Sequence, residues 1–151
     1  MNIVLKNVKI NQALSEETNC FSATIYLDGG RVGTVANRGC GGGNEYHWSD
    51  KDAGERLHEY AKSLPPLDEL SMDLDLLIDD ILRKQDIESQ YKKWCKKDVM
   101  YRLKGDKEGV WRSARPRGGP PWTPAMKNHL ITKYGDKIET ILNQQLYGDP
   151  V

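Results

Sequence analysis

The chain has 151 residues, and its 22 basic and 22 acidic residues give a formal net charge of zero. Hydrophobic residues make up 38% of it and include seven tyrosines and four tryptophans, which excludes an intrinsically disordered protein. No apolar run reaches the roughly 18 residues that a membrane-spanning helix needs, and the N-terminus lacks the pattern of a signal peptide. An odd count of three cysteines argues against a secreted disulfide framework. We therefore expect a cytoplasmic protein.

The balanced total hides an asymmetry along the chain. Residues 51–90 contain five basic and eleven acidic residues, a net charge of −6, whereas residues 92–117 contain ten and three, a net charge of +7. Such a division often marks a surface that binds an anionic partner. The alternative is that the acidic and basic segments face one another, within one chain or between two copies. The balanced total excludes a DNA mimic, which needs a strong negative excess.

The N-terminal third has the pattern of a β-meander. A strand is expected from Ile3 to Ile10, and apolar residues alternate with polar ones from Cys20 to Leu27. The turn Asp28-Gly29-Gly30 then leads into a third strand from Arg31 to Asn37.

Two helices are expected after the meander and a Gly-rich loop at residues 39–43. Ser49 or Asp50 can cap a helix from Lys51 to Leu64, which Pro65-Pro66 stops. A longer helix is expected from Asp68 to Lys97, because leucines and isoleucines recur there at helical spacing.

The C-terminal third begins with a hairpin that pairs Val99–Leu103 with Val110–Ala114. Thr123-Pro124 then opens a helix that runs to about Tyr134. Residues 137–143 are expected to form a final strand, and residues 146–151 a frayed tail.

These elements predict a single α+β domain over residues 1–145. Its antiparallel sheet would consist of the meander and the hairpin, packed by two or three helices with the long helix as the spine. The apolar stripe of that helix exceeds what one small sheet can cover. We therefore expect a homodimer or a higher homo-oligomer.

The basic hairpin and the loop after it are the main candidate site. The candidate ligand-binding residues there are Arg102, Arg112, Arg115, Arg117 and Trp111. Arginine binds phosphate through two hydrogen bonds and aromatic rings stack on bases, so this mixture suits a nucleotide or a nucleic acid. The alternative is a tryptophan in the core with arginines at the surface.

Arg102 and Arg112 lie at equal distances in sequence from Lys107, the expected centre of the hairpin turn. Equal spacing predicts that they are near-opposite residues on the same face of the sheet. Two guanidinium groups there would need an anion between them, either a carboxylate of the acidic helix or a phosphate of a ligand.

The Gly-rich loop and the aromatic residues after it form a second candidate. The residues singled out are Gly41, Gly42, Gly43, Tyr46, His47 and Trp48. Glycines allow backbone N–H groups to converge on an anion, and such a loop could close over a ligand held by the hairpin. The pattern matches neither a phosphate-binding loop of the Gly-Lys-Ser/Thr type nor a dinucleotide-binding fold. A flexible connector is the alternative.

Other chemistry has weaker support in the sequence. The cysteines and histidines lack the close ligand pairs of a structural zinc site, and no local pattern marks a nucleophile. The aspartates between Asp73 and Asp80 suit a solvated helix face better than a magnesium site. We expect no cofactor, and binding rather than catalysis.

Two stretches resemble a family of small bacteriophage and prophage proteins of unassigned activity. The first runs from Ser15-Glu16-Glu17-Thr18-Asn19-Cys20-Phe21 through Ala23, Tyr26, Asp28-Gly29, Gly33, Val35 and Asn37 to Gly39. The second runs from Met100-Tyr101-Arg102-Leu103-Lys104 through Trp111-Arg112 to Lys133-Tyr134-Gly135-Asp136-Lys137. The resemblance implies a viral origin and action inside a bacterial host, where such proteins often counter defence systems by binding.

Three functions follow as hypotheses. The first is a non-enzymatic protein that sequesters a nucleotide-like anionic ligand, such as a host immune signal, with the hairpin and the Gly-rich loop. The second is an inhibitor that binds a host enzyme. The third is a nucleic-acid-binding protein that uses residues 92–117.

Overall fold

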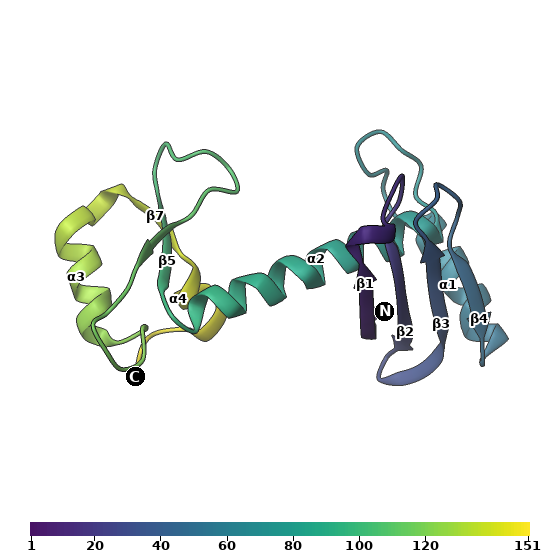
Figure 1. Cartoon of the computed structure of the whole chain (residues 1–151), viewed down its shortest axis with the longest axis horizontal. Coiled ribbons are helices and arrows are strands. Elements are labelled where there is room, and N and C mark those ends of the chain that lie inside the picture. The colour runs from purple at the N-terminus through teal and green to yellow at the C-terminus, as the bar shows by residue number, and fades with distance from the viewer. The chain divides into compact units, whose positions relative to one another are not determined.

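The computed structural model describes all of residues 1–151 and confirms the α+β class (Figure 1). The sequence predicts one domain with one sheet. The contacts instead cluster in two compact units, residues 1–84 and residues 85–151, and each unit has its own antiparallel sheet. The long helix α2 (Leu74–Cys95) contributes its first part to unit 1 and the rest to unit 2.

Unit 1 contains a four-stranded meander with the strand order β1-β2-β3-β4. Its strands are β1 (Ile3–Asn11), β2 (Cys20–Leu27), β3 (Gly30–Arg38) and β4 (Glu45–Trp48). The expected three strands are confirmed, and β4 is an addition that the sequence analysis treated only as an aromatic cluster. Between β2 and β3 the turn residues Asp28 and Gly29 both have positive φ, as the expected tight turn requires.

The first helix of unit 1, α1 (Lys51–Ser63), begins where its local signal predicts. The side chain of Asp50 accepts a hydrogen bond from the backbone N–H of Ala53 at 3.0 Å, which caps the helix. The long helix begins six residues later than expected, because residues 68 and 69 adopt positive φ in a separate turn. The side chain of Asp73 then accepts from the backbone N–H of Leu76 at 2.8 Å.

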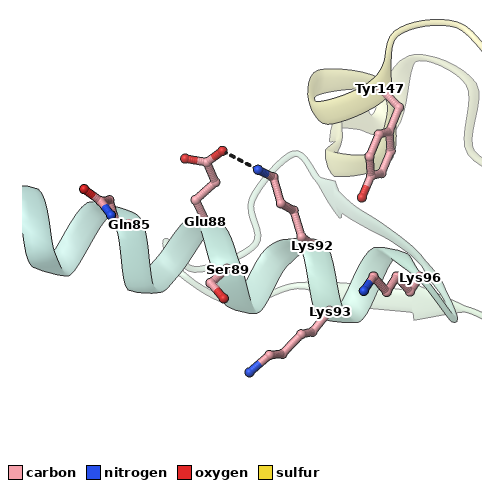
Figure 2. A pocket seen from close by; sticks show the side chains of 7 residues that line it. All are labelled: Gln85, Glu88, Ser89, Lys92, Lys93, Lys96 and Tyr147. Carbon is pink, nitrogen blue, oxygen red and sulfur yellow. Dashed lines mark ion pairs between the residues drawn. The ribbon is translucent and has the colours of Figure 1, made fainter. Parts of the chain in front are cut away.

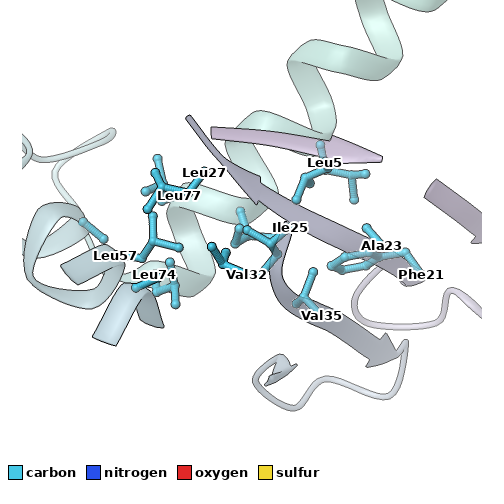
Figure 3. Packing of buried hydrophobic residues seen from close by; sticks show 14 residues of the cluster. Leu5, Phe21, Ala23, Ile25, Leu27, Val32, Val35, Leu57, Leu74 and Leu77 are labelled. Carbon is cyan, nitrogen blue, oxygen red and sulfur yellow. The ribbon is translucent and has the colours of Figure 1, made fainter. Parts of the chain in front are cut away.

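The core of unit 1 lies between one face of its sheet and the two helices (Figure 3). Its buried residues come from all of these elements except β4: Leu5, Phe21, Ala23, Ile25, Leu27, Val32, Val35, Ala53, Leu57, Ala61, Leu74, Leu77, Ile78 and Leu82. The alternation expected in β2 is confirmed, because its core residues are every second residue. The opposite face of the sheet contributes nothing to this core.

Unit 2 contains a three-stranded sheet with the order β6-β5-β7 and two further helices. These elements are β5 (Val99–Leu103), β6 (Arg112–Ala114), α3 (Pro124–Tyr134), β7 (Ile138–Ile141) and α4 (Leu142–Tyr147). Helix α3 starts at the predicted cap, since the Thr123 hydroxyl accepts from the backbone N–H of Met126 at 3.2 Å.

The C-terminal end differs from the expectation. The final strand ends at Ile141, and α4 follows it directly. Leu146, at the start of the expected frayed tail, belongs to α4 and packs against the buried cluster of Cys95, Met100 and Leu142. A second buried cluster holds β5, α3 and β7 together.

Most of the apolar stripe of α2 is covered within one chain. Leu74, Leu77, Ile78 and Leu82 lie in the core of unit 1, and Tyr91 and Cys95 pack in unit 2. The expected homodimer stays a prediction, and the exposed apolar residue that α2 leaves for it is Trp94. None of the helices is long and apolar enough to span a bilayer.

Candidate functional site

The register of the basic hairpin differs from the prediction by one residue. Tyr101 pairs with Arg112, and continuing this ladder places Arg102 opposite Trp111. The Arg102 guanidinium lies 5.7 Å from the centroid of the Trp111 ring, which agrees with that register. Since a shift of one residue turns a side chain to the other face of a strand, Arg102 and Arg112 do not share a face. The predicted pair of facing arginines is therefore wrong.

Two of the four arginines are held by carboxylates of unit 2 itself. Arg112 donates two hydrogen bonds of 2.9 Å to Asp106 in the hairpin loop, and Arg115 donates to Asp98 at 2.5 and 3.1 Å. The Arg112 guanidinium and a backbone N–H hold the pKa of the Asp106 carboxyl well below its usual range. These pairs neutralise the cations that the sequence analysis assigned to a ligand.

Arg102 is occupied in a different way. One of its terminal nitrogens donates to the backbone carbonyls of Asp106 and Lys107, at 3.2 and 3.1 Å. Its Nε lies 3.6 Å from a carboxylate oxygen of Glu139 and makes no hydrogen bond. Arg102 thus stabilises the hairpin loop, and only Arg117, exposed and without a partner, is free for a ligand.

Trp111 is a packing residue. It lies against the buried cluster of Cys95, Met100 and Leu142, and its ring is 5.6 Å from that of Tyr91 in an edge-to-face arrangement. Its indole N–H donates to the Tyr91 hydroxyl at 3.3 Å. Trp111 therefore packs in the core, the alternative to a ligand-binding role for this tryptophan.

The Gly-rich loop belongs to unit 1, so the two candidate sites lie in different units. Three backbone N–H groups around the loop already donate within unit 1. Gly39 donates to Asn37, Gly41 to Thr18 and Asn44 to Asp75, at 2.8, 3.3 and 3.2 Å. These donors are turned to side chains of the unit, so they do not form a nest for an external anion.

The backbone conformation at position 41 favours glycine. Its φ is +92°, and a Cβ there would lie 2.2 Å from a carboxylate oxygen of Glu17. Gly42 would meet nothing within 4 Å, whereas a Cβ on Gly43 would lie 3.0 Å from Asp75. Since both carboxylates end flexible side chains, the positive φ of Gly41 is the firm constraint on this loop.

The aromatic residues of β4 are divided between the two faces of the sheet. Tyr46 and Trp48 stack at 5.4 Å on the core side, and the Tyr46 hydroxyl donates to Asp75 at 2.6 Å. Burial, followed by this hydrogen bond, raises the pKa of the Tyr46 phenol above its usual range. His47, between them, pairs with Thr34 on the open face. Tyr46, His47 and Trp48 therefore do not form one binding surface.

Unit 2 has a groove that the sequence analysis missed. It encloses about 460 Å³ between the C-terminal half of α2 and α4, and Figure 2 shows Tyr147 reaching from α4 toward the lysines of α2. The lining residues are Gln85, Glu88, Ser89, Lys92, Lys93, Lys96 and Tyr147. The helical spacing of the lysines was visible in the sequence. Tyr147 could not be placed, because α4 was not predicted.

The lysines of this groove differ in their partners. Lys92 forms an ion pair of 2.9 Å with Glu88 on the same helix. Lys93, Lys96 and the neighbouring Lys97 have no ion-pair or hydrogen-bond partner for their side chains. We call these three residues the lysine cluster. These three uncompensated cations lie within five residues of the sequence.

The charges of the two units are opposite. Unit 1 contains nine basic and fourteen acidic residues, a net charge of −5, and unit 2 contains thirteen and eight, a net charge of +5. No group of three or more side chains is arranged to hold a metal ion. No family model, curated protein or solved structure matches the chain. The resemblance to small bacteriophage proteins therefore stays a prediction.

Proposed function

We propose that the protein binds nucleic acid through the basic surface of unit 2. The observation that carries the proposal is the lysine cluster, Lys93, Lys96 and Lys97, whose ammonium groups have no partner in the protein. Lysines that contact phosphates release the counterions condensed on a nucleic acid, and this release drives binding. The net charge of +5 on unit 2 acts in the same direction.

An extended polyanion suits the groove better than a single nucleotide. Sites that hold small ligands tightly bury most of the ligand surface, whereas Lys92 and Tyr147 in this groove are about half exposed. Lysine also offers a point charge without the two-pronged geometry of arginine. A chain of phosphates can contact several such lysines at once, and the exposed ring of Tyr147 can stack on a base.

The lysine cluster also has an explanation that needs no ligand. Cations at the C-terminal end of a helix interact favourably with the helix dipole, by about 0.3–1 kcal/mol each. Under that explanation, removal of the lysines changes stability slightly and changes no binding. The two explanations thus predict different nucleic-acid affinities for the lysine variant in the experiment below.

The other two hypotheses have less support. Two arginines expected to hold a nucleotide-like ligand are paired with Asp106 and Asp98 instead, and the Gly-rich loop belongs to unit 1. Inhibition of a host enzyme and a role against host defence stay predictions. Among the three functions, nucleic-acid binding depends on residues that are free to act.

The test is fluorescence anisotropy with labelled 20-nucleotide single-stranded and duplex DNA, using the full chain and the variant Lys93→Gln/Lys96→Gln/Lys97→Gln. The matched control is Lys51→Gln/Arg56→Gln/Lys62→Gln, which removes three exposed charges from α1 of unit 1. We expect the first variant to bind both probes roughly tenfold or more weakly, and the salt dependence of log K to fall by about 2 to 3.

Two results would overturn the proposal. The first is equal affinity of the lysine variant and the matched control. The second is competition by a free mononucleotide at concentrations that also raise the melting temperature, which would support sequestration of a small ligand instead.

A further inference from the structure

The open face of the sheet in unit 1 carries a concentration of positive charge that the composition of the unit hides. In an antiparallel sheet, directly paired residues project from the same face. The rows on this face are Val4–Tyr26–Arg31, Lys6–Thr24–Thr34–His47, Lys9–Ser22–Ala36–Glu45 and Asn11–Cys20–Arg38. Every row contains one lysine or arginine, and only one residue of the face, Glu45, is acidic. An acidic unit thus has a basic face.

Two irregularities of the sheet create this arrangement. Lys6 and Lys9 are three residues apart and would point to opposite faces in a regular strand. The register of β1 shifts between them, with Asn7 at a φ of +53°, so that both pair with open-face residues of β2. Bulges commonly redirect a side chain in this way, at some cost in regular pairing.

The second irregularity has the same effect on β3. Arg31 and Gly33 would share a face in a regular strand, yet Gly33 pairs with the core residue Ile25. The register shifts at Val32, and Arg31 pairs with Tyr26 on the open face. Each of the two bulges therefore turns one cation to this face.

The cations flank a strip without charge. Lys6 and Lys9 lie on β1, and Arg31 and Arg38 lie on β3. The strand between them, β2, presents only Cys20, Ser22, Thr24 and Tyr26 on this face, and none of these four is fully buried. Neighbouring strands are roughly 4.8 Å apart, so the two flanks are roughly 10 Å apart. We call this surface, the β2 strip with its two basic flanks, the β2 lane.

The partners of the cations leave the lane available. Lys9 and Arg31 have no partner, and the exposed Arg38 makes only a loose ion pair of 3.6 Å with Glu45. The Lys6 ammonium lies 4.2 Å from the centroid of the Tyr26 ring, which holds it over the sheet. No element of unit 1 packs on this face, because α1 and α2 cover the other one.

We infer that the β2 lane binds single-stranded nucleic acid. Its width admits one extended strand, whose bases can contact the hydroxyl groups and the ring of β2 while the phosphates meet the cations on either flank. Rows on one face repeat every two residues, roughly 6.8 Å, a spacing comparable to that of successive phosphates in an extended strand. A duplex is too wide for the lane and meets fewer of its cations. The inference uses residues separate from the lysine cluster and does not rest on the proposal for unit 2.

The test compares three variants in anisotropy titrations with single-stranded and duplex DNA, each made in the full chain carrying Lys93→Gln/Lys96→Gln/Lys97→Gln, so that binding by unit 2 does not mask the lane. Lys6→Gln/Lys9→Gln/Arg31→Gln removes three cations of the lane, and Lys51→Gln/Arg56→Gln/Lys62→Gln removes the same charge from the helical side. Thr24→Glu adds a negative charge in the centre of the lane and leaves the cations in place. Circular dichroism establishes that each variant is folded.

We expect the lane variant to weaken single-strand binding roughly tenfold or more and to lower its salt dependence by about 2, since each single-strand phosphate contact contributes about 0.7. Thr24→Glu should weaken it as well, and duplex binding should change no more than in the control. Photo-crosslinking of a bromouridine-containing strand should label Tyr26.

Three outcomes would overturn the inference. The first is a single-strand affinity of the lane variant equal to that of the control. The second is a duplex affinity that falls as much as the single-strand affinity, which would show an effect of overall charge. The third is a dimer of the original chain in light scattering that is absent in the lane variant, which would assign the face to the acidic surface of a second copy. Loss of binding in the lane variant with no loss in the lysine variant would keep this inference and reject the proposal for unit 2.

Discussion

The two units of the chain are held together in different ways. Unit 1 has one cluster of fourteen buried hydrophobic residues between its sheet and its helices, whereas unit 2 has two clusters of four and three. Each unit also has a buried asparagine, Asn37 in unit 1 and Asn143 in unit 2, and unit 2 has arginine–carboxylate pairs around its hairpin. The larger apolar core makes unit 1 depend strongly on burial, and the Asp106–Arg112 pair makes unit 2 depend on pH.

Ile25→Ala should have the largest effect, because Ile25 is fully buried at the centre of the unit 1 core. We expect a loss of about 2–5 kcal/mol in the free energy of unfolding of unit 1. Hydrogen exchange read by mass spectrometry should show it as faster exchange in residues 1–84 only. The control is Thr24→Ala on the open face, with an effect of about 0.5 kcal/mol or less. Equal loss of protection in both units would show that they unfold as one.

Asn143→Ala should have the next largest effect, and in unit 2. The Asn143 side chain is fully buried, accepts from the backbone N–H of Met100 at 2.8 Å and donates to the carbonyl of Asp98 at 3.1 Å. Its loss leaves buried polar groups without partners, at about 1–3 kcal/mol for each group. Urea unfolding followed by tryptophan fluorescence measures the loss, with the exposed Asn128→Ala as the control. A loss of unfolding free energy no larger than that of the control would show that Asn143 does not stabilise unit 2.

Asp106→Asn should have the smallest effect at neutral pH and should test the pH dependence of unit 2. The pKa of Asp106 is lowered in the folded state relative to about 3.9 in the unfolded chain. The pair with Arg112 therefore stabilises unit 2 above about pH 4, and this stability is lost as the pH falls toward the folded pKa.

The measurement for this prediction is the difference in unfolding free energy between the original chain and Asp106→Asn, at about pH 7 and about pH 3. The difference should shrink at the lower pH. Asp136→Asn, which removes an exposed acid without a partner in unit 2, is the control. An unchanged difference would show that the ion pair contributes nothing to the pH dependence of unit 2.

Elements with local signals were predicted closely. Helix α1 starts after its Asp50 cap, and α3 spans Pro124–Tyr134, as its Thr123 cap and first-turn proline indicated. The turn at Asp28-Gly29 was also predicted. Each signal is an interaction between residues fewer than four apart, so the sequence shows both partners together.

The candidate site was predicted less well, because its chemistry depends on register. The hairpin turn is centred between Asp106 and Lys107, and this half-residue difference separates Arg102 from Arg112. No carboxylate bridges the two arginines: Arg112 pairs with Asp106 from within the hairpin, and not with a carboxylate of the acidic helix. Charge counts along the chain could not show that Arg112 and Arg115 are neutralised.

The α+β class, the meander, the capped helices and the unequal distribution of charge could be predicted from the sequence alone, since they follow from periodicity and from contacts between near neighbours. Three features emerge only from the folded chain: the packing of α2 in two cores, the two bulges that turn Lys9 and Arg31 to one face, and the set of cations without a partner. A side chain reaches only the partners that strand register and helix packing bring within a few ångströms. That selection depends on residues far apart in the chain.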